Sequence, residues 1–110
     1  MSATVHVFPP NQSHSAQIVN NFRDLKRLVK GDAQSIDDAL VEYRMLGETV
    51  LIFNEEGQPL GLPQNETFPI TYSDAPNRDP DVIVLGEQIP YLLGTVVMMT
   101  RRDWERVAAG

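Results

Sequence analysis

The stretch LVEYRMLGETVLIFNEEGQPLGLPQN, residues 40–65, decides the fold. Apolar residues alternate with charged ones from Val41 to Met45, a pattern that is typical of a β-strand. The run VLIF, four consecutive apolar or β-branched residues, indicates a second strand. A glycine and a glutamate at positions 47–48 separate the two and suit a tight turn. We therefore expect a β-hairpin over residues 40–53.

A helix that continues through Tyr43 is the competing interpretation of this region. Ser35 and Asp38 have the spacing of a capping pair, and residues 36–40 could form a helical turn. We favour the hairpin, but the sequence leaves helix and strand both open for residues 36–46.

A second turn, NEEG, follows the hairpin at residues 54–57. An asparagine at its first position and Gly57 at its fourth are typical of a type I turn followed by a left-handed residue that forms a bulge. Beyond it we expect a returning strand at residues 58–60 and the loop GLPQN at residues 61–65.

Before this stretch, the sequence predicts one strand and one helix. The strand covers residues 3–8, where two prolines stop it. The helix covers residues 15–30, because its apolar residues recur at intervals of three and four. Ser13 or Ser15 would cap its start, and Gly31 occupies the position just beyond its end. The apolar face of this helix comprises Ile18, Val19, Phe22, Leu25, Leu28 and Val29.

Beyond the stretch, the sequence predicts a flexible segment, two short strands and a C-terminal helix. Three prolines within residues 68–81 indicate the flexible segment. Strands are expected at residues 82–85 and 95–99. Thr100 would cap a helix over residues 101–109. One face of this helix is formed by Trp104, Val107 and Ala108.

Together these elements predict an α+β fold: a small, mainly antiparallel sheet with the N-terminal helix packed on one face and a short C-terminal helix. The length of 110 residues suits a single domain over residues 1–110, and 42% apolar residues can form an ordinary core. The chain starts without the basic and apolar segments of a secretory signal. Its longest nearly apolar stretch, residues 89–99, is too short for a membrane span. We expect a soluble, cytoplasmic protein.

The chain has nine basic and fifteen acidic side chains, a net charge of −6, and no cysteine. The missing cysteines exclude disulfides, a thiolate nucleophile and cysteine-ligated metals. The acidic total disfavours general nucleic-acid binding. Residues 31–100 hold twelve acidic and two basic residues, net −10, and the remaining segments are net +4. The bases of these segments are Arg23, Lys26, Arg27, Lys30, Arg101, Arg102 and Arg106.

This distribution has two interpretations. Two solvated helix faces are the simpler one. In the other, the acidic middle region meets a basic partner and the basic helices meet an acidic one.

Residues 53–65, FNEEGQPLGLPQN, are the most distinctive part of the chain. They resemble a family of small proteins of unknown function from bacteriophages and plasmids, which combines an NEEG turn, three intervening residues and a GLPxN loop. That family continues with a G-[TND]-x-V-V strand, which residues 94–97 match. The resemblance covers residues 36–99. It implies a mobile genetic element expressed in a bacterial host and transfers no catalytic residue.

The motif has an architectural and a binding interpretation. In the first, glycines permit bends, and asparagine side chains bond backbone groups of the loops. In the second, the GLPQN loop is one wall of a ligand or partner site, because loops held by a rigid hairpin commonly bind. The candidate binding residues are Asn54, Glu55, Glu56, Gly57, Gly61, Leu62, Pro63, Asn65, Tyr72, Arg101 and Arg102.

The sequence assembles no catalytic or metal-binding set. His6 and His14 are isolated and lack the spacing of metal ligands. The adjacent glutamates at 55–56 would point to different sides, and the aspartate pairs at 37–38 and 79–81 complete no known ligand set. Nucleophile-elbow, P-loop and dinucleotide fingerprints are absent. We therefore expect no enzymatic activity, no cofactor and no metal.

The leading hypothesis is a non-enzymatic phage- or plasmid-encoded accessory protein that binds a bacterial host protein and inhibits host defence or metabolism. The alternative is a protein that binds an anionic or nucleotide-like small molecule through Asn65 and Tyr72, with Arg101 or Arg102 as the anion partner. Two apolar segments near the C-terminus belong either to the core or to a homodimer interface. We expect neither sequence-specific DNA binding nor membrane association.

Overall fold

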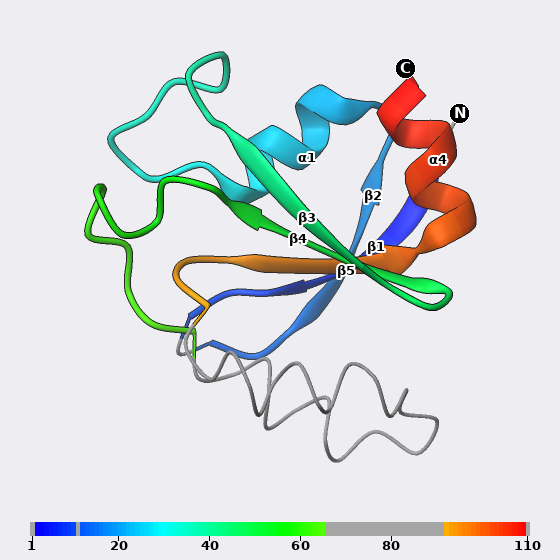
Figure 1. The fold of residues 1–110 in the computed structure, drawn as a ribbon, viewed down its shortest axis with the longest axis horizontal. Helices are drawn as coiled ribbons and strands as arrows, with labels where there is room; N and C mark the ends of the chain where they lie inside the picture. The colour runs from blue at the N-terminus through cyan, green and yellow to red at the C-terminus, as the bar shows by residue number, and fades with distance from the viewer. Residues whose placement is uncertain (1, 11, 66–91, 110) are drawn as a thin grey trace.

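The computed structural model describes residues 2–10, 12–65 and 92–109. These residues form an antiparallel five-stranded sheet and two helices, which confirms the predicted α+β fold (Figure 1). The elements in chain order are β1 (Ala3–Phe8), β2 (Ser15–Val19), α1 (Phe22–Val29), β3 (Val41–Leu46), β4 (Thr49–Asn54), β5 (Val96–Thr100) and α4 (Arg101–Ala109). The strand order is β2-β1-β5-β4-β3, so β2 and β3 are the edges of the sheet.

The hairpin predicted at residues 40–53 is present as β3 and β4. The paired residues end with Leu46 opposite Thr49, which leaves Gly47 and Glu48 as a two-residue loop. Gly47 has a φ of 61°. A positive φ at the first of two loop residues suits a type II′ turn, whose twist matches that of the two strands.

The competing helix through Tyr43 is wrong. The capping-pair contact itself is present, since the backbone N–H of Asp38 donates to Ser35 Oγ at 3.3 Å. Residues 36–38 nevertheless form only an isolated turn. The alternation of apolar and charged residues from Val41 to Met45 suits a strand in a sheet with one covered face. In a helix the same alternation would distribute the apolar side chains all around the axis.

The helix predicted at residues 15–30 is wrong in its first third. Those residues form β2, which pairs antiparallel with β1 so that Ala3 lies opposite Val19. The spacing of the apolar residues in this segment favours a helix, but β1 supplies hydrogen-bond partners for a strand. Pairing with β1 bonds the backbone groups of every second residue of this edge strand, and the strand forms. Ile18 is consequently 70% exposed instead of lying on a helix face.

The cap of α1 is Asn21, not either predicted serine. Asn21 has an extended backbone, and its side-chain oxygen accepts a hydrogen bond from the N–H of Asp24 at 2.9 Å. This contact satisfies one of the N–H groups that a helix start leaves free. At the other end, Lys30 is the C-cap, and Gly31 does not adopt a left-handed conformation.

We expect Asn21→Ala to lower the free energy of unfolding by about 1 kcal/mol, because the alanine cannot cap the helix. Chemical denaturation measures this loss. Asn20→Ala is the matched control, since Asn20 is exposed and bonds through its backbone N–H. Equal losses in the two variants would contradict the assigned cap.

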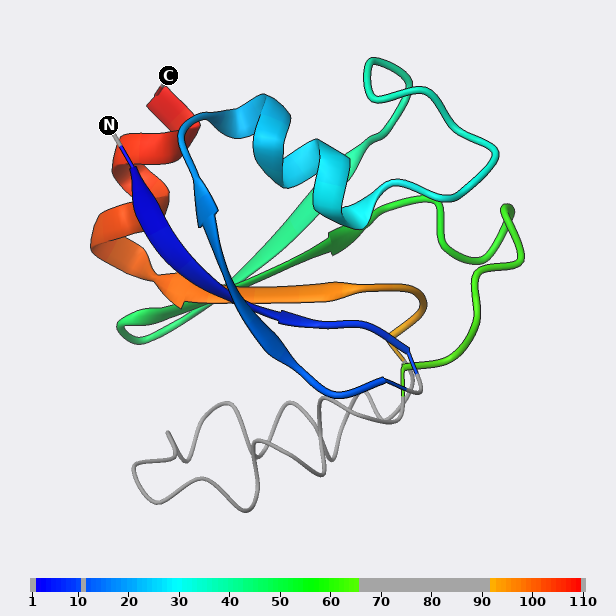
Figure 2. The same ribbon diagram turned by 180° about the vertical axis from the view of Figure 1, so that it is seen from behind.

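Both helices cover the same face of the sheet (Figure 2). The core between the layers contains Val5 of β1, Ile52 of β4 and Val97 of β5, which meet Leu25 of α1. Val96 and Met99 are buried as well, so the apolar strand near the C-terminus belongs to the core.

The C-terminal helix begins where the capping pair predicts. Thr100 Oγ1 accepts a hydrogen bond from the N–H of Asp103 at 3.1 Å. The ring of Trp104 contacts the rings of Phe22 and Tyr43, with centroid distances of 6.2 and 4.9 Å. The predicted helix face is right for Trp104 and Val107, which are buried, and wrong for Ala108, which is exposed.

Of the remaining predicted elements, one is confirmed, one is wrong, and two lie outside the described residues. β5 confirms the strand predicted at residues 95–99. The returning strand at residues 58–60 is wrong, because these residues turn on themselves, with the N–H of Leu60 bonded to the carbonyl of Glu56 at 3.1 Å. The flexible segment and the strand predicted between residues 68 and 85 lie outside the described residues.

Candidate functional site

Asn65, at the end of the GLPQN loop, is fully buried. Its side-chain Nδ2 donates to the carbonyl of Phe8 at 2.6 Å and to that of Gly94 at 2.8 Å. Its backbone N–H bonds the carbonyl of Leu92 at 2.7 Å. One side chain therefore joins the loop to the end of β1 and to the segment before β5, which confirms that the asparagine bonds backbone groups.

Asn54, the first residue of the NEEG turn, makes a second junction. Its Nδ2 donates to the carbonyl of Val29 at 3.2 Å and to Gln34 Oε1 at 2.8 Å. Its Oδ1 accepts from the backbone N–H of Glu56 at 2.8 Å. The turn is thereby tied to the end of α1 and to the loop that follows it.

Three glycines accommodate the loop, though not in the predicted way. Gly57, expected to be left-handed, is not; a Cβ there would lie 2.9 Å from Leu93 Cβ. Gly94 has a φ of 78°, and a Cβ on it would lie 2.9 Å from Leu62 Cδ1. On the other side, a Cβ on Gly31 would lie 3.1 Å from Leu62 Cδ2. The side chain of Leu62 thus packs between two glycines that come from distant parts of the chain.

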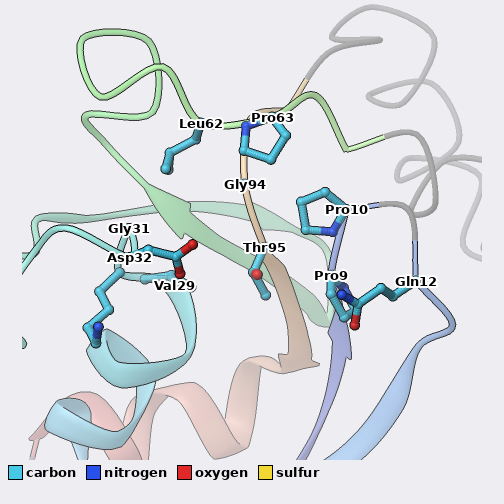
Figure 3. Close-up of a pocket in the computed structure, with 11 residues that line it drawn as sticks. Pro9, Pro10, Gln12, Val29, Gly31, Asp32, Leu62, Pro63, Gly94 and Thr95 are labelled. Carbon is cyan, nitrogen blue, oxygen red and sulfur yellow. The ribbon is translucent and has the colours of Figure 1, made fainter.

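A hollow of about 290 Å³ lies beside Leu62. Leu62 and Pro63 form one wall, as Figure 3 shows, and Asp32 and Thr95 lie on its other sides. Lys30 also lines it, although its Nζ already donates to the carbonyl of Gln34 at 3.3 Å. The GLPQN loop does border a hollow. Side chains of opposite charge, Lys30 and Asp32, line it.

The structure brings only some of the predicted binding residues together. Leu62 and Pro63 line the hollow. Arg101 and Arg102 begin α4, at the opposite end of β5 from the loop, so they do not lie beside Asn65 (Figure 1). Tyr72 lies outside the described residues. The polar groups that the sequence analysis missed are those of Gln12, Lys30, Asp32 and Thr95, which share no motif because three separate segments supply them.

Two backbone segments that lie side by side, the loop between α1 and β3 and the NEEG turn, both carry acidic residues. The N–H of Glu55 bonds the carbonyl of Leu40 at 2.8 Å, which holds the two segments together. We name the group of carboxylates that they carry the acidic loop surface. It consists of Asp32, Asp37, Asp38, Glu55 and Glu56.

Most carboxylates of the acidic loop surface form no ion pair with a cation of the described residues. Within residues 2–10, 12–65 and 92–109, only Asp37 of this group forms an ion pair, with Arg23 of α1. All five side chains are exposed except Glu56, which is half-buried.

The basic helix faces are more neutral than the sequence indicates. In α1, Arg27 pairs with Asp24 at 3.3 Å, besides the Arg23 pair with Asp37. In α4, Arg101 pairs with Glu105 at 3.4 Å, and Arg106 pairs with Asp103. These exposed pairs contribute little stability, but they reduce the positive potential of both helices.

The two histidines occupy different settings. His6 is an exposed residue of β1. The ring of His14 stacks on that of Phe8, with centroids 5.3 Å apart. Among the described residues, no three histidine, aspartate or glutamate side chains are grouped so that they could hold a metal ion.

No protein-family model, curated protein or solved structure matches the chain. None of the helices in the described part of the chain has the length and apolar character required to cross a membrane.

Proposed function

We propose that this chain is a non-enzymatic accessory protein of a phage or plasmid that binds a basic surface of a bacterial host protein in the cytoplasm. The observation that carries the proposal is the acidic loop surface, which lies on ordered backbone and is left largely unpaired. The setting in a mobile genetic element rests on the resemblance of residues 53–65 to phage and plasmid proteins.

The scaffold favours this kind of recognition. Asn54 anchors the NEEG turn through three hydrogen bonds, so the backbone that carries the neighbouring carboxylates is held in place. Charges held in place lose less conformational entropy on binding than charges on a flexible tail. An unpaired acidic surface also attracts a basic partner at a distance and so increases the association rate.

A pair of matched double variants tests the proposal. Asp32→Asn with Glu55→Gln removes two carboxylates from the acidic loop surface. Glu48→Gln with Glu105→Gln removes two exposed carboxylates elsewhere. We expect wild type and the second variant to capture the same host protein from a bacterial lysate in a salt-sensitive manner, and the first variant to lose it. Equal capture by both variants would refute the acidic loop surface as the binding site.

The hollow beside Leu62 favours a second candidate function, the binding of a small anionic molecule. Its volume is near the lower end of ligand sites. Lys30 takes the place that the sequence analysis gave to Arg101 or Arg102. A nucleotide that binds there raises the melting temperature of wild type by mass action and has a smaller effect on Lys30→Gln. An unchanged melting temperature at saturating nucleotide would dismiss this candidate.

A further inference from the structure

The outer edge of β3 presents regularly spaced backbone groups. In the antiparallel pair with β4, the N–H of Glu55 bonds the carbonyl of Leu40, which defines a hydrogen-bonded pair of residues. Because such pairs alternate with non-bonded ones, Glu42 and Arg44 direct their backbone groups toward β4. Val41, Tyr43 and Met45 therefore direct their N–H and carbonyl groups away from the sheet.

This edge is open in the part of the chain that the structure describes, where β3 has β4 as its only neighbouring strand. It carries no proline or lysine of the kind that protects edge strands. Two apolar side chains on the helix-covered face, Tyr43 and Met45, are 50% and 40% exposed. The edge thus combines unpaired backbone groups with apolar surface that a further strand would cover.

We propose that a second copy of this chain pairs with this edge, β3 against β3 in antiparallel orientation, with the two-fold axis at Tyr43. In this register Val41 lies opposite Met45 of the partner subunit. Glu42 lies opposite Arg44 of the partner subunit, and Arg44 lies opposite the partner's Glu42. The two sheets join into one continuous sheet with an isologous interface.

Charge selects this register over its neighbours. The outward backbone groups allow only registers in which residues 41, 43 and 45 pair among themselves. Moving the axis by one residue in either direction places Glu42 opposite the partner's Glu42, or Arg44 opposite the partner's Arg44. Like charges directly opposite are destabilising, and opposite charges are stabilising. The sequence VEYRM is therefore complementary to its own reverse only when Tyr43 lies on the axis.

Self-complementarity is the reason to assign a second copy and not another protein. A strand of a different protein would need no such symmetry in β3. The other edge, β2, has the sequence SAQIV and no charged side chain, so charge selects no register there. The pairing does not depend on the proposed function, since the acidic loop surface takes no part in it.

Charge reversal tests the register directly. We expect wild type to show a concentration-dependent monomer–dimer equilibrium in sedimentation velocity. Glu42→Arg alone, or Arg44→Glu alone, should weaken self-association about tenfold or more, because each introduces two like-charge contacts. A one-to-one mixture of the two variants should restore dimers, because both arginines of one chain then face glutamates of the other. Glu48→Arg, in the exposed hairpin loop, is the control and should dimerise as wild type does.

Amide hydrogen exchange gives a second readout that a folding defect would not imitate. On raising the protein concentration, the amides of Val41, Tyr43 and Met45 should become protected, while those of Glu42 and Arg44 are already bonded to β4. A wild type that stays monomeric at high concentration, or single variants that associate as strongly as wild type, would overturn the proposal. So would a mixture that fails to restore dimers, or protection that appears on another segment instead.

Discussion

Replacement of Asn65 by alanine is expected to lower the free energy of unfolding by about 3 kcal/mol. The alanine removes the Nδ2 donor from the carbonyls of Phe8 and Gly94, and the site is fully buried. A buried acceptor that loses its partner costs about 1–3 kcal/mol, because it has also been removed from water. Urea denaturation with a shared slope for wild type and variant measures the difference.

Two further variants separate the hydrogen bonds from the loss of volume. Asn65→Leu fills the space with a side chain of similar size and still supplies no donor, so it should be destabilised comparably. Gln64→Ala changes the neighbouring, half-buried side chain and should stay within about 0.5 kcal/mol of wild type. A leucine variant as stable as wild type would show that the donor contributes nothing.

Gly94→Ala is the second change with a large expected effect, also about 3 kcal/mol. The φ of 78° places an alanine in the left-handed region, which costs roughly 1–2 kcal/mol. Its Cβ would also lie 2.9 Å from Leu62 Cδ1. Leu62 cannot move toward the other side of its site, because its other methyl group lies close to Gly31. Crowding of this kind typically costs about 1–3 kcal/mol.

A double-mutant cycle isolates the crowding. In a Leu62→Ala background, Gly94→Ala should cost about 1 kcal/mol less than in wild type, since the clashing methyl group is gone. Gly61→Ala is the comparison for the backbone, because Gly61 has a φ of 64° and no atom within 4 Å of an added Cβ. If Gly61→Ala and Gly94→Ala lower the free energy of unfolding equally, the packing of Leu62 against Gly94 has no energetic role.

These variants also bear on function, because the anchors that hold the loop shape the hollow beside Leu62 and Pro63. The acidic loop surface depends on a different anchor, Asn54. A variant of Asn65 should therefore disturb small-molecule binding more than capture of a basic protein, which distinguishes the two proposed functions in a single comparison.

Local patterns were enough to predict several elements of this protein. The β3–β4 hairpin follows from alternating apolar residues before a glycine that tolerates a positive φ and a run of four apolar residues after it. The helix α4 follows from Thr100 and Asp103 at capping distance. Both structures form between residues close in the chain, where a short pattern already contains all the partners.

Only the tertiary structure decided the rest. Residues 15–19 are a strand and not a helix, because β1 offers them backbone partners that no local pattern reports. The chain after Gly57 turns instead of forming a strand, because Leu62 packs between Gly31 and Gly94. Asn65 bonds a carbonyl 57 residues away in the sequence. The strand at residues 15–19 depends on a neighbouring strand, and the other two outcomes depend on contacts between segments far apart in the sequence, which exist only after the sheet has brought those segments together.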